Sequence, residues 1–325
     1  MPVTLTKSLK YLHDLTDVVG VLEHAKYHFP RRSEGYSTDD NARAFQVRLR
    51  SGKSGKNYLD FLTKAWTGDG FHNDLSFEGS WLDQPGWGEW SGRAISALGE
   101  GSAKGLVREK KQCERLMQQI LAKLPQLESP RVIAQVIWGL SWLPETEQLT
   151  VLADKLVTAH VAQSDRDWKW FEKGIFYDNG KLPGALFRAS EVLGQQSYVQ
   201  AASQTLDFLL KCSYHPPLDC LVFPGNEGWW KKNKPWELFD QQPVDAGSMV
   251  EACVQAFKVT GRVKYKKAAH MAWDWYQGRN LLRMSLVDEQ TGGIRDGLRP
   301  DGFNQNEGAE AVISYILAGL AIAEL

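Results

Sequence analysis

Two kinds of helical pattern alternate along the chain. Segments of the first kind combine Ala, Gly and Ser with apolar residues at helical spacing, so they can be buried on all sides. They lie at 40–50, 91–100, 130–143, 182–193, 243–260 and 307–324. Segments of the second kind are amphipathic, with the polar stripe that is typical of a helix facing solvent on one side. They lie at 57–66, 106–124, 147–162, 197–211 and 263–276, and residues 6–18 can supply a sixth.

This alternation predicts an all-α fold, the (α/α)6 toroid, in which small-residue helices form an inner ring and amphipathic helices an outer ring. The unequal loops argue against a solenoid, which needs a regular period. No Gly- or Pro-rich linker divides the chain, so we expect a single domain over residues 1–325. Short strands are expected only in loops, at 71–77, 174–177 and 221–223.

The polar motifs of the chain precede the small-residue helices. Inner helices of a toroid run parallel, so these motifs should meet at one mouth of the ring. They are rich in carboxylates and amides, which bind hydroxyl groups. The chain also has 13 tryptophans, many of them in polar loops. A flat indole ring suits the apolar face of a sugar, and the sequence therefore predicts a carbohydrate site at this mouth.

Composition and charge exclude several other functions. The net charge of −1 comes without a basic stripe, which argues against nucleic-acid binding. The start of the chain lacks the apolar core of a secretory signal, no run of 18 apolar residues exists, and the cysteines show no CxxC spacing. We therefore expect a cytoplasmic protein with no membrane contact, metal or cofactor. Among the seven histidines, only His72 and His215 are predicted to lie in loops at the mouth.

Cleavage of a glycosidic bond requires two carboxyl groups, one protonated and one ionised. The sequence offers Asp39 and Asp40 at the start of one inner helix and Glu307 and Glu310 at the start of another, with Asp178 as a further candidate. Two structural interpretations compete with catalysis. Asp39 can cap its helix, and Glu310 can pair with an inner-ring arginine such as Arg43. The sequence alone does not assign the acid and the base.

Residues near these carboxylates are expected to bind the sugar. The predicted contacts are Tyr36, Asn41, Arg43, His72, Trp81, Asp83, Trp170, Glu172, Asn179, Trp230, Gln242, Asp245, Asp296, Asn304 and Asn306.

Four long motifs carry a resemblance to a known family. They are EGYSTDDNARA (34–44), YDNGKLPGAL (177–186), DQQPVDA (240–246) and TGGIRDGLRPDGFNQNEGAE (291–310). Together they resemble the domain found C-terminal to, or beside, bacterial family-4-type glycosyltransferases, over nearly the whole chain. The resemblance implies a six-hairpin glycosidase-like toroid and functional association with a glycosyltransferase. Related sequences often have Gln where Glu307 stands, which makes Glu310 the better candidate for the essential carboxylate.

Three functions fit these observations. The first is a glycoside hydrolase that acts on an oligosaccharide through paired carboxylates. The second is a sugar epimerase or isomerase on the same toroid, which would move a proton with a pair of histidines. The third is a non-catalytic glycan-binding partner of a glycosyltransferase, with a lined cleft but no matched acid and base.

Overall fold

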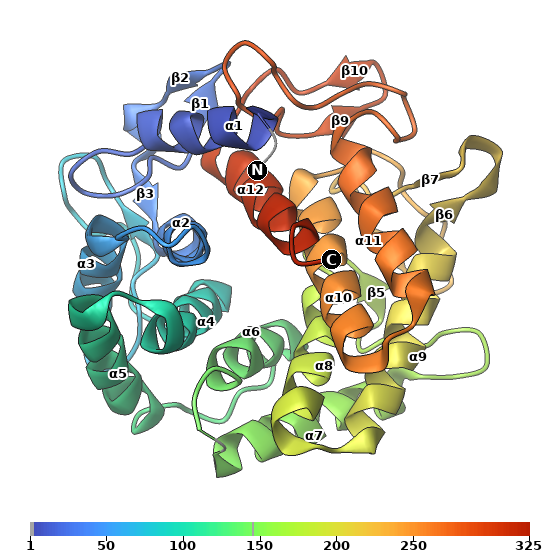
Figure 1. Cartoon of the computed structure of the whole chain (residues 1–325), viewed down its shortest axis with the longest axis horizontal. Coiled ribbons are helices and arrows are strands. Elements are labelled where there is room, and N and C mark those ends of the chain that lie inside the picture. Colours follow the sequence, from blue (N-terminus) through green and yellow to red (C-terminus); the bar gives the residue numbers. More distant parts are fainter. Residues whose placement is uncertain (1–2, 145) are drawn as a thin grey trace.

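The computed structural model describes residues 3–144 and 146–325, and twelve α-helices in this part of the chain form two concentric rings (Figure 1). The inner ring consists of α2 (Thr38–Arg50), α4 (Glu89–Lys104), α6 (Pro130–Leu140), α8 (Lys181–Leu193), α10 (Pro243–Thr260) and α12 (Ala309–Ile322). The outer ring consists of α1 (Val3–Asp14), α3 (Lys56–Ala65), α5 (Val107–Leu121), α7 (Glu147–Gln163), α9 (Gln196–Ser213) and α11 (Val263–Tyr276). Each inner helix contacts the next, and α12 contacts α2, which closes the ring. The predicted (α/α)6 toroid is confirmed.

Short antiparallel strand pairs tie the loops together. Two pairs join different loops: β3 (Tyr36–Ser37) with β4 (Asp74–Leu75), and β5 (Gly174–Ile175) with β8 (Trp230–Lys231). Three pairs are local: β1 (Ala25–Lys26) with β2 (Phe29–Pro30), β6 (Tyr214–His215) with β7 (Cys220–Leu221), and β9 (Leu298–Arg299) with β10 (Gly302–Phe303). The predicted strands at 71–77, 174–177 and 221–223 each contain or overlap one of these.

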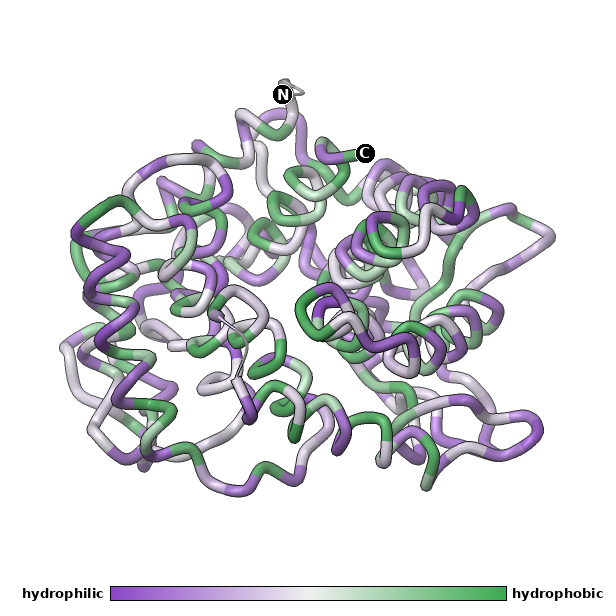
Figure 2. The backbone as a smooth tube through the Cα atoms, turned by 60° about the horizontal axis from the view of Figure 1, so that its bottom comes forward, coloured by the Kyte–Doolittle hydropathy of each residue, from purple (hydrophilic) through white to green (hydrophobic). Residues whose placement is uncertain are grey.

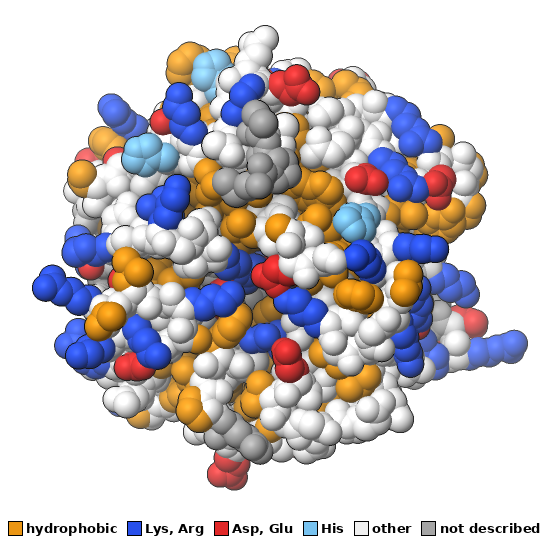
Figure 3. All heavy atoms as spheres, in the orientation of Figure 1, with side chains coloured by type: hydrophobic (Ala, Val, Ile, Leu, Met, Phe, Trp, Pro, Cys, Tyr) orange, Lys and Arg blue, Asp and Glu red, His pale blue; other side chains and the backbone are white. Residues whose placement is uncertain are grey.

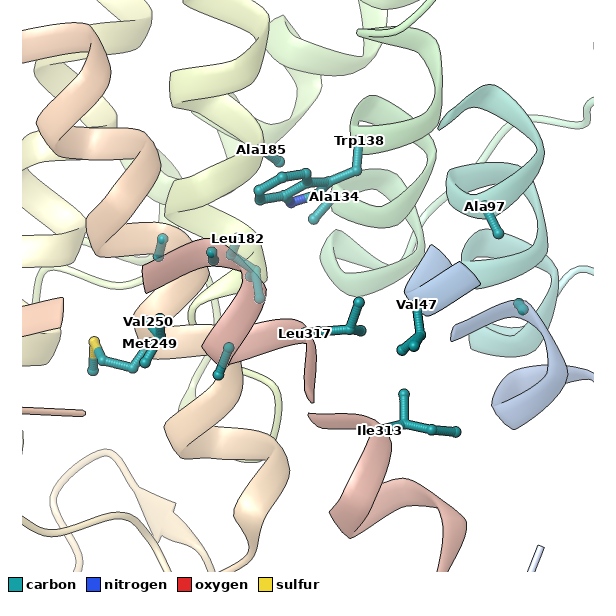
Figure 4. Close-up of a cluster of buried hydrophobic side chains, with 14 of the residues drawn as sticks. Val47, Ala97, Ala134, Trp138, Leu182, Ala185, Met249, Val250, Ile313 and Leu317 are labelled. Carbon is teal, nitrogen blue, oxygen red and sulfur yellow. The ribbon is translucent and has the colours of Figure 1, made fainter. Parts of the chain in front are cut away.

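The core lies between the two rings and inside the inner one. Figure 4 shows buried side chains that come from all six inner helices, among them Val47 of α2, Ala97 of α4 and Ile313 of α12. Helices at the periphery alternate hydrophilic and hydrophobic segments (Figure 2), because only one side of each faces the core. Sequence and burial therefore agree on which ring each helix joins.

Glycines allow the inner helices to approach backbone to backbone. A Cβ atom on Gly99 of α4 would overlap the carbonyl group of Gly139 of α6, and one on Gly139 would overlap the carbonyl group of Ile95. These two helices therefore pack more closely than any side chain at their crossing point would permit.

The surface carries charges of both signs. Figure 3 shows Lys and Arg side chains interspersed with Asp and Glu over one face of the molecule. Within residues 3–144 and 146–325, none of the helices combines the length and the apolar character needed to cross a membrane.

Replacing Gly99 with Ala tests the close approach of α4 and α6. Alanine in a helix interior normally stabilises by about 0.5–1 kcal/mol relative to glycine, whereas the added methyl group here meets a backbone carbonyl that cannot move freely. We expect Gly99→Ala to lower the free energy of unfolding by about 1–3 kcal/mol, measured by chemical denaturation. Gly86→Ala is the control, because its methyl group would meet only the edge of Trp90, at 3.5 Å. Equal stability of the two variants would contradict the packing described.

Candidate active site

Two adjoining cavities open at the mouth where the inner helices begin. We call the first the polar pocket, with a volume of about 370 Å³. Its lining consists of Glu23, His24, Ser37, Asp39, Asp40, Arg43, Asn73, Asn226, Asp240, Gln242, Pro243, Asp296, Arg299, Asn304, Gly308, Glu310 and Ala311. We call the second the aromatic pocket, with a volume of about 700 Å³. Its lining consists of Asp39, Trp87, Gly88, Glu89, Trp90, Arg93, Ser129, Val132, Tyr177, Asn226, Trp229, Gln242 and Glu310.

The two pockets form one cleft. Asp39, Asn226, Gln242 and Glu310 line both of them, so these residues mark the junction. The first turns of α2, α4, α10 and α12 and the N-cap of α6 all contribute to the lining. The inner helices therefore bring their N-terminal ends to one mouth, as the position of the polar motifs predicted.

Arg43 holds three carboxylates at the junction. Its Nη2 atom lies 2.8 Å from Asp39 Oδ1, 2.8 Å from Asp40 Oδ1 and 3.0 Å from Glu310 Oε2. These oxygens share one nitrogen, so no two of them are separated by more than two hydrogen-bond lengths. That is less than the roughly 6.5–9.5 Å between the carboxyl groups of an inverting glycosidase. An inverting pair therefore cannot be made from two of these three oxygens.

A second guanidinium reaches the same place from α4. Arg93 Nη1 is paired with Asp39 Oδ2, and its Nη2 lies 3.1 Å from Asp178 Oδ2. Burial raises the pKa of Asp39, but the charges of Arg43 and Arg93 more than offset this, and the pKa is held below its ordinary value. Asp39 is therefore ionised and bound on both oxygens.

Other carboxyl groups of the polar pocket hold a proton more tightly than usual. Burial raises the pKa of Glu23 to about 8, and the negative charges of Asp40, Asp74, Asp39 and Glu310 contribute. Burial likewise raises the pKa of Asp40 to about 7, against the opposing charge of Arg43.

Asp296 behaves in the same way. Its burial raises the pKa to about 6, although the N–H of Gly308 donates to its carboxylate at 2.6 Å. Ionised and protonated carboxyl groups therefore face the same cavity, which is the arrangement that acid–base chemistry requires.

Some of the predicted site residues line this cleft: Asp39, Asp40, Arg43, Gln242, Asp296, Asn304 and Glu310. The other predicted carboxylates are placed elsewhere. Glu307 has no exposed surface, pairs with Arg295 at 2.6 Å and accepts a hydrogen bond from Thr291. Asp178 is buried below the cleft, where Arg93 and Gln135 donate to it. The structure gives both residues structural partners.

The predicted tryptophans lie outside the cleft lining. Trp170 is completely buried, Trp81 stacks on His72, and Trp230 stacks on Trp236. Other tryptophans form the aromatic wall, namely Trp87, Trp90 and Trp229. All six stand in polar loops or at helix starts, and the sequence carries no signal for the direction in which each ring points.

The remaining predicted contacts support the loops around the cleft. Tyr36 donates to Asp17, Asn41 accepts from the N–H of Val21, and Asp83 accepts from the N–H groups of Asn73 and Asp74. The carbonyl of Asp83 also contacts the ring of His72.

The predicted contact residues in the loops before α8 and α12 also have hydrogen-bond partners within the protein. Glu172 and Asn179 both accept from Arg131, Asn179 donates to Asp245, and Asn306 accepts from the N–H of Tyr27. These contacts explain polar residues in the motifs without a ligand.

Sequence reasoning missed the segment after α1. Glu23 and His24 line the polar pocket, with His24 Nε2 3.5 Å from Glu23 Oε1. Within the described residues, His24 is the one histidine that lines either pocket. His72 lies against Trp81, and His215 lies in β6 after the outer helix α9. Neither His72 nor His215, the two histidines predicted to lie in loops at the mouth, lines either pocket.

Comparison with known structures places the fold among enzymes that act on sugars. A D-mannose isomerase superposes with a TM-score of 0.74 at 11% identity, over 99% of this chain and 97% of that chain. A sugar epimerase from a ruminal bacterium gives 0.73 at 13% identity, over 99% and 97%. The GH76 α-mannanase of Bacteroides thetaiotaomicron gives 0.68 at 12% identity, over 99% and 95%.

These likenesses show that the chain shares the (α/α)6 toroid of epimerases, isomerases and glycoside hydrolases, and they favour none of the three reactions. No protein-family model matches the chain, and no curated protein matches its sequence.

Removing the guanidinium group of Arg93 tests the ion pairs that it forms with Asp39 and Asp178. Arg93→Met leaves Asp39 and Asp178 buried with one cationic or polar partner fewer, and we expect the free energy of unfolding to fall by about 3–5 kcal/mol. Lys56→Met is the matched control, since the Lys56–Asp60 pair is exposed and such pairs contribute less than about 1 kcal/mol.

The effect of Arg93→Met should depend on pH. A depressed carboxyl pKa stabilises the fold above the unfolded value and loses that contribution as the pH falls through the folded value. The difference from wild type should therefore shrink below about pH 4. Denaturation curves at several pH values check this, and a constant difference would contradict the assignment to Asp39.

Proposed function

We propose that the protein is a glycoside hydrolase that cleaves an oligosaccharide at the junction of the two pockets, with Glu23 as the general acid and Glu310 as the anionic partner. The observation that carries the proposal is the coexistence, in one cleft, of a carboxyl group that keeps its proton at neutral pH and carboxylates paired with arginine. Glycoside hydrolysis needs this difference between two carboxyl groups.

Glu23 suits the role of the acid by position as well as by pKa. Its side chain is about one-third exposed and lines the polar pocket, so it is open to a sugar bound there. Its backbone is fixed, because its carbonyl accepts from the N–H of Ala309 and its N–H donates to the carbonyl of Gly35. With a pKa of about 8, it remains protonated at neutral pH.

Glu310 is the anionic carboxylate that is open to the substrate. Its side chain is 42% exposed and accepts one hydrogen bond from Arg43. Asp40, by contrast, is 4% exposed and uses its oxygens on Arg43 and Ser37. We therefore assign Asp39 and Asp40 to holding Arg43 in place, and Glu310 to the substrate as nucleophile or base.

Sugar binding is supported by the aromatic pocket. The rings of Trp87, Trp90, Tyr177 and Trp229 line it beside the carboxylates of the junction. Aromatic faces next to hydroxyl-binding carboxylates and amides are the combination that recognises a sugar ring. Tyr177 is held in place by its hydroxyl group, which donates to Glu89 at 2.7 Å.

An epimerase or isomerase is the second candidate. The contact between His24 and Glu23 is the observation that favours it, since a histidine beside a carboxyl group can move a proton. A glycan-binding partner of a glycosyltransferase, working in the cytoplasm, is the third. The toroids of known epimerases and isomerases superpose as well as that of the mannanase, so the test must separate the reactions.

Product analysis with Glu23→Gln and Glu310→Gln tests the proposal. With α- and β-linked gluco- and manno-oligosaccharides as substrates, we expect wild type to release shorter sugars and each variant to lose about 10²–10⁴-fold in kcat. Wild-type activity should fall as the pH rises through about 8, where Glu23 loses its proton. Glu23→Gln should regain activity on aryl glycosides whose leaving groups need no protonation, and its alkaline limb should disappear.

The control is Glu34→Gln, since Glu34 pairs with Arg31 and lies outside both pockets. Epimerised or isomerised sugar without cleavage, abolished by His24→Ala, would replace the hydrolase with the second candidate. Tight binding of an oligosaccharide by all variants with no turnover would replace it with the third.

A further inference from the structure

The two pockets differ in how they are closed. On its outer side the polar pocket is bounded by loops that hydrogen-bond to one another. Gln241, before α10, exchanges both backbone hydrogen bonds with Leu298, before α12, at 3.0 and 2.8 Å. Arg299 reaches Asp240 across the same gap at 3.3 Å.

The segment after α1 continues this wall. The N–H of Ala309 donates to Glu23, and the N–H of Glu307 donates to Tyr27 at 2.9 Å. Tyr27 in turn donates its N–H to Asn306 Oδ1 at 3.0 Å. Three loops that are far apart in the sequence are thus hydrogen-bonded to one another along this side of the polar pocket.

The chemistry of the two pockets differs as well. The described lining of the polar pocket contains no Trp, Tyr or Phe, and its side chains are acceptors and donors such as Asp296, Asn304 and Asn73. Such a lining can bind the hydroxyl groups around a whole sugar ring. The aromatic pocket is nearly twice as large, opens more widely to solvent and offers stacking faces. It suits several consecutive sugars that keep part of their surface in water.

We propose that the enzyme is exo-acting: the polar pocket receives the non-reducing terminal sugar of an oligosaccharide, and the rest of the chain leaves through the aromatic pocket. This inference rests on the proposed hydrolase function. Asp39, Asn226, Gln242 and Glu310 stand where the two pockets meet, so the bond that spans the junction is the one between the terminal sugar and the next.

Electrostatics fixes the direction of the chain. In the transition state of glycoside cleavage, positive charge develops on the sugar that loses its bond, not on the leaving group. Asp296, whose pKa of about 6 leaves it mostly ionised at neutral pH, and Glu310 line the polar pocket and stabilise positive charge on a sugar bound there. The leaving group gains the proton of Glu23 and needs only a stacking platform, which Trp229 and its neighbours provide.

Linear gluco- and manno-hexasaccharides labelled at the reducing end test both the exo action and the direction. We expect the first products to be an unlabelled monosaccharide and a labelled pentasaccharide. Labelled di- and trisaccharides at early times would overturn the exo action, and a labelled monosaccharide would overturn the direction. Each of these outcomes leaves the hydrolase function intact, whereas absence of any cleavage counts against that function.

A binding experiment tests the closed pocket without turnover. Glu310→Gln protein is titrated by calorimetry with hexasaccharides that carry a bulky blocking group at one end. Blocking the reducing end should leave the dissociation constant unchanged, while blocking the non-reducing end should weaken binding by at least tenfold. Equal binding of both, or binding of neither, would overturn the inference.

The kinetic constants of two variants distinguish the contributions of the two pockets to substrate binding. Trp229→Leu should raise KM for the hexasaccharides by a larger factor than KM for an aryl monosaccharide glycoside, because the aryl group reaches only the part of the aromatic pocket next to the junction. Asn304→Ala should lower kcat/KM for both substrates. A merely structural role for Trp229 would affect both substrates equally.

Discussion

The arrangement of charge at the axis of the ring is the constraint on which the rest of the structure depends. Six helices begin near one mouth, and each carries partial positive charge at its N-terminus. Acidic residues in the first turns, such as Asp39, Glu89, Asp245 and Glu310, complement these dipoles. So many carboxylates cannot all be ionised in a buried space, and arginines from the same helices compensate for part of their charge.

The arginines also connect neighbouring elements. Arg43 of α2 reaches Glu310 of α12, Arg93 of α4 reaches Asp39 of α2, and Arg131 of α6 reaches Glu172 and Asn179 in the loop before α8. The network thus holds together the first turns of the ring and fixes the position of the carboxylates. Removing Arg93 leaves the buried carboxylates of Asp39 and Asp178 with one partner fewer, so stability and the geometry of the site depend on the same residues.

Sequence patterns predicted the ring because they report burial directly. A helix rich in Ala, Gly and Ser is buried on all sides, and an amphipathic helix is buried on one, so the alternation of the two defines both rings. The pairing of Glu310 with Arg43, weighed from the sequence as the structural alternative to catalysis, is present at 3.0 Å. Pairing and reactivity are compatible here, because Glu310 keeps 42% of its side chain exposed.

The walls of the site could not be predicted in the same way. Trp81 and Trp87 stand in one polar loop, yet Trp81 stacks on His72 while Trp87 lines the aromatic pocket. Glu23 stands in a segment with no motif, and it reaches the pocket because its backbone is bonded to Ala309, which is distant in the sequence. Both outcomes depend on tertiary contacts between loops, to which the periodicity of a single segment is insensitive.

Under the proposed function, the candidate reactions on sugars differ in what lies beside Glu23. The arginines near the axis compensate for Asp39 most fully. Burial raises the pKa of Asp40 to about 7 and that of Glu23 to about 8, and the negative charges of neighbouring carboxylates contribute. Glu23 therefore keeps a proton at the mouth of the ring, beside the arginine–carboxylate network that stabilises the fold. Which reaction follows depends on the group placed beside that proton. If the proton of Glu23 lies next to a glycosidic oxygen, cleavage of the glycosidic bond is favoured. If Glu23 acts together with His24, transfer of a proton to or from a carbon of the sugar is favoured.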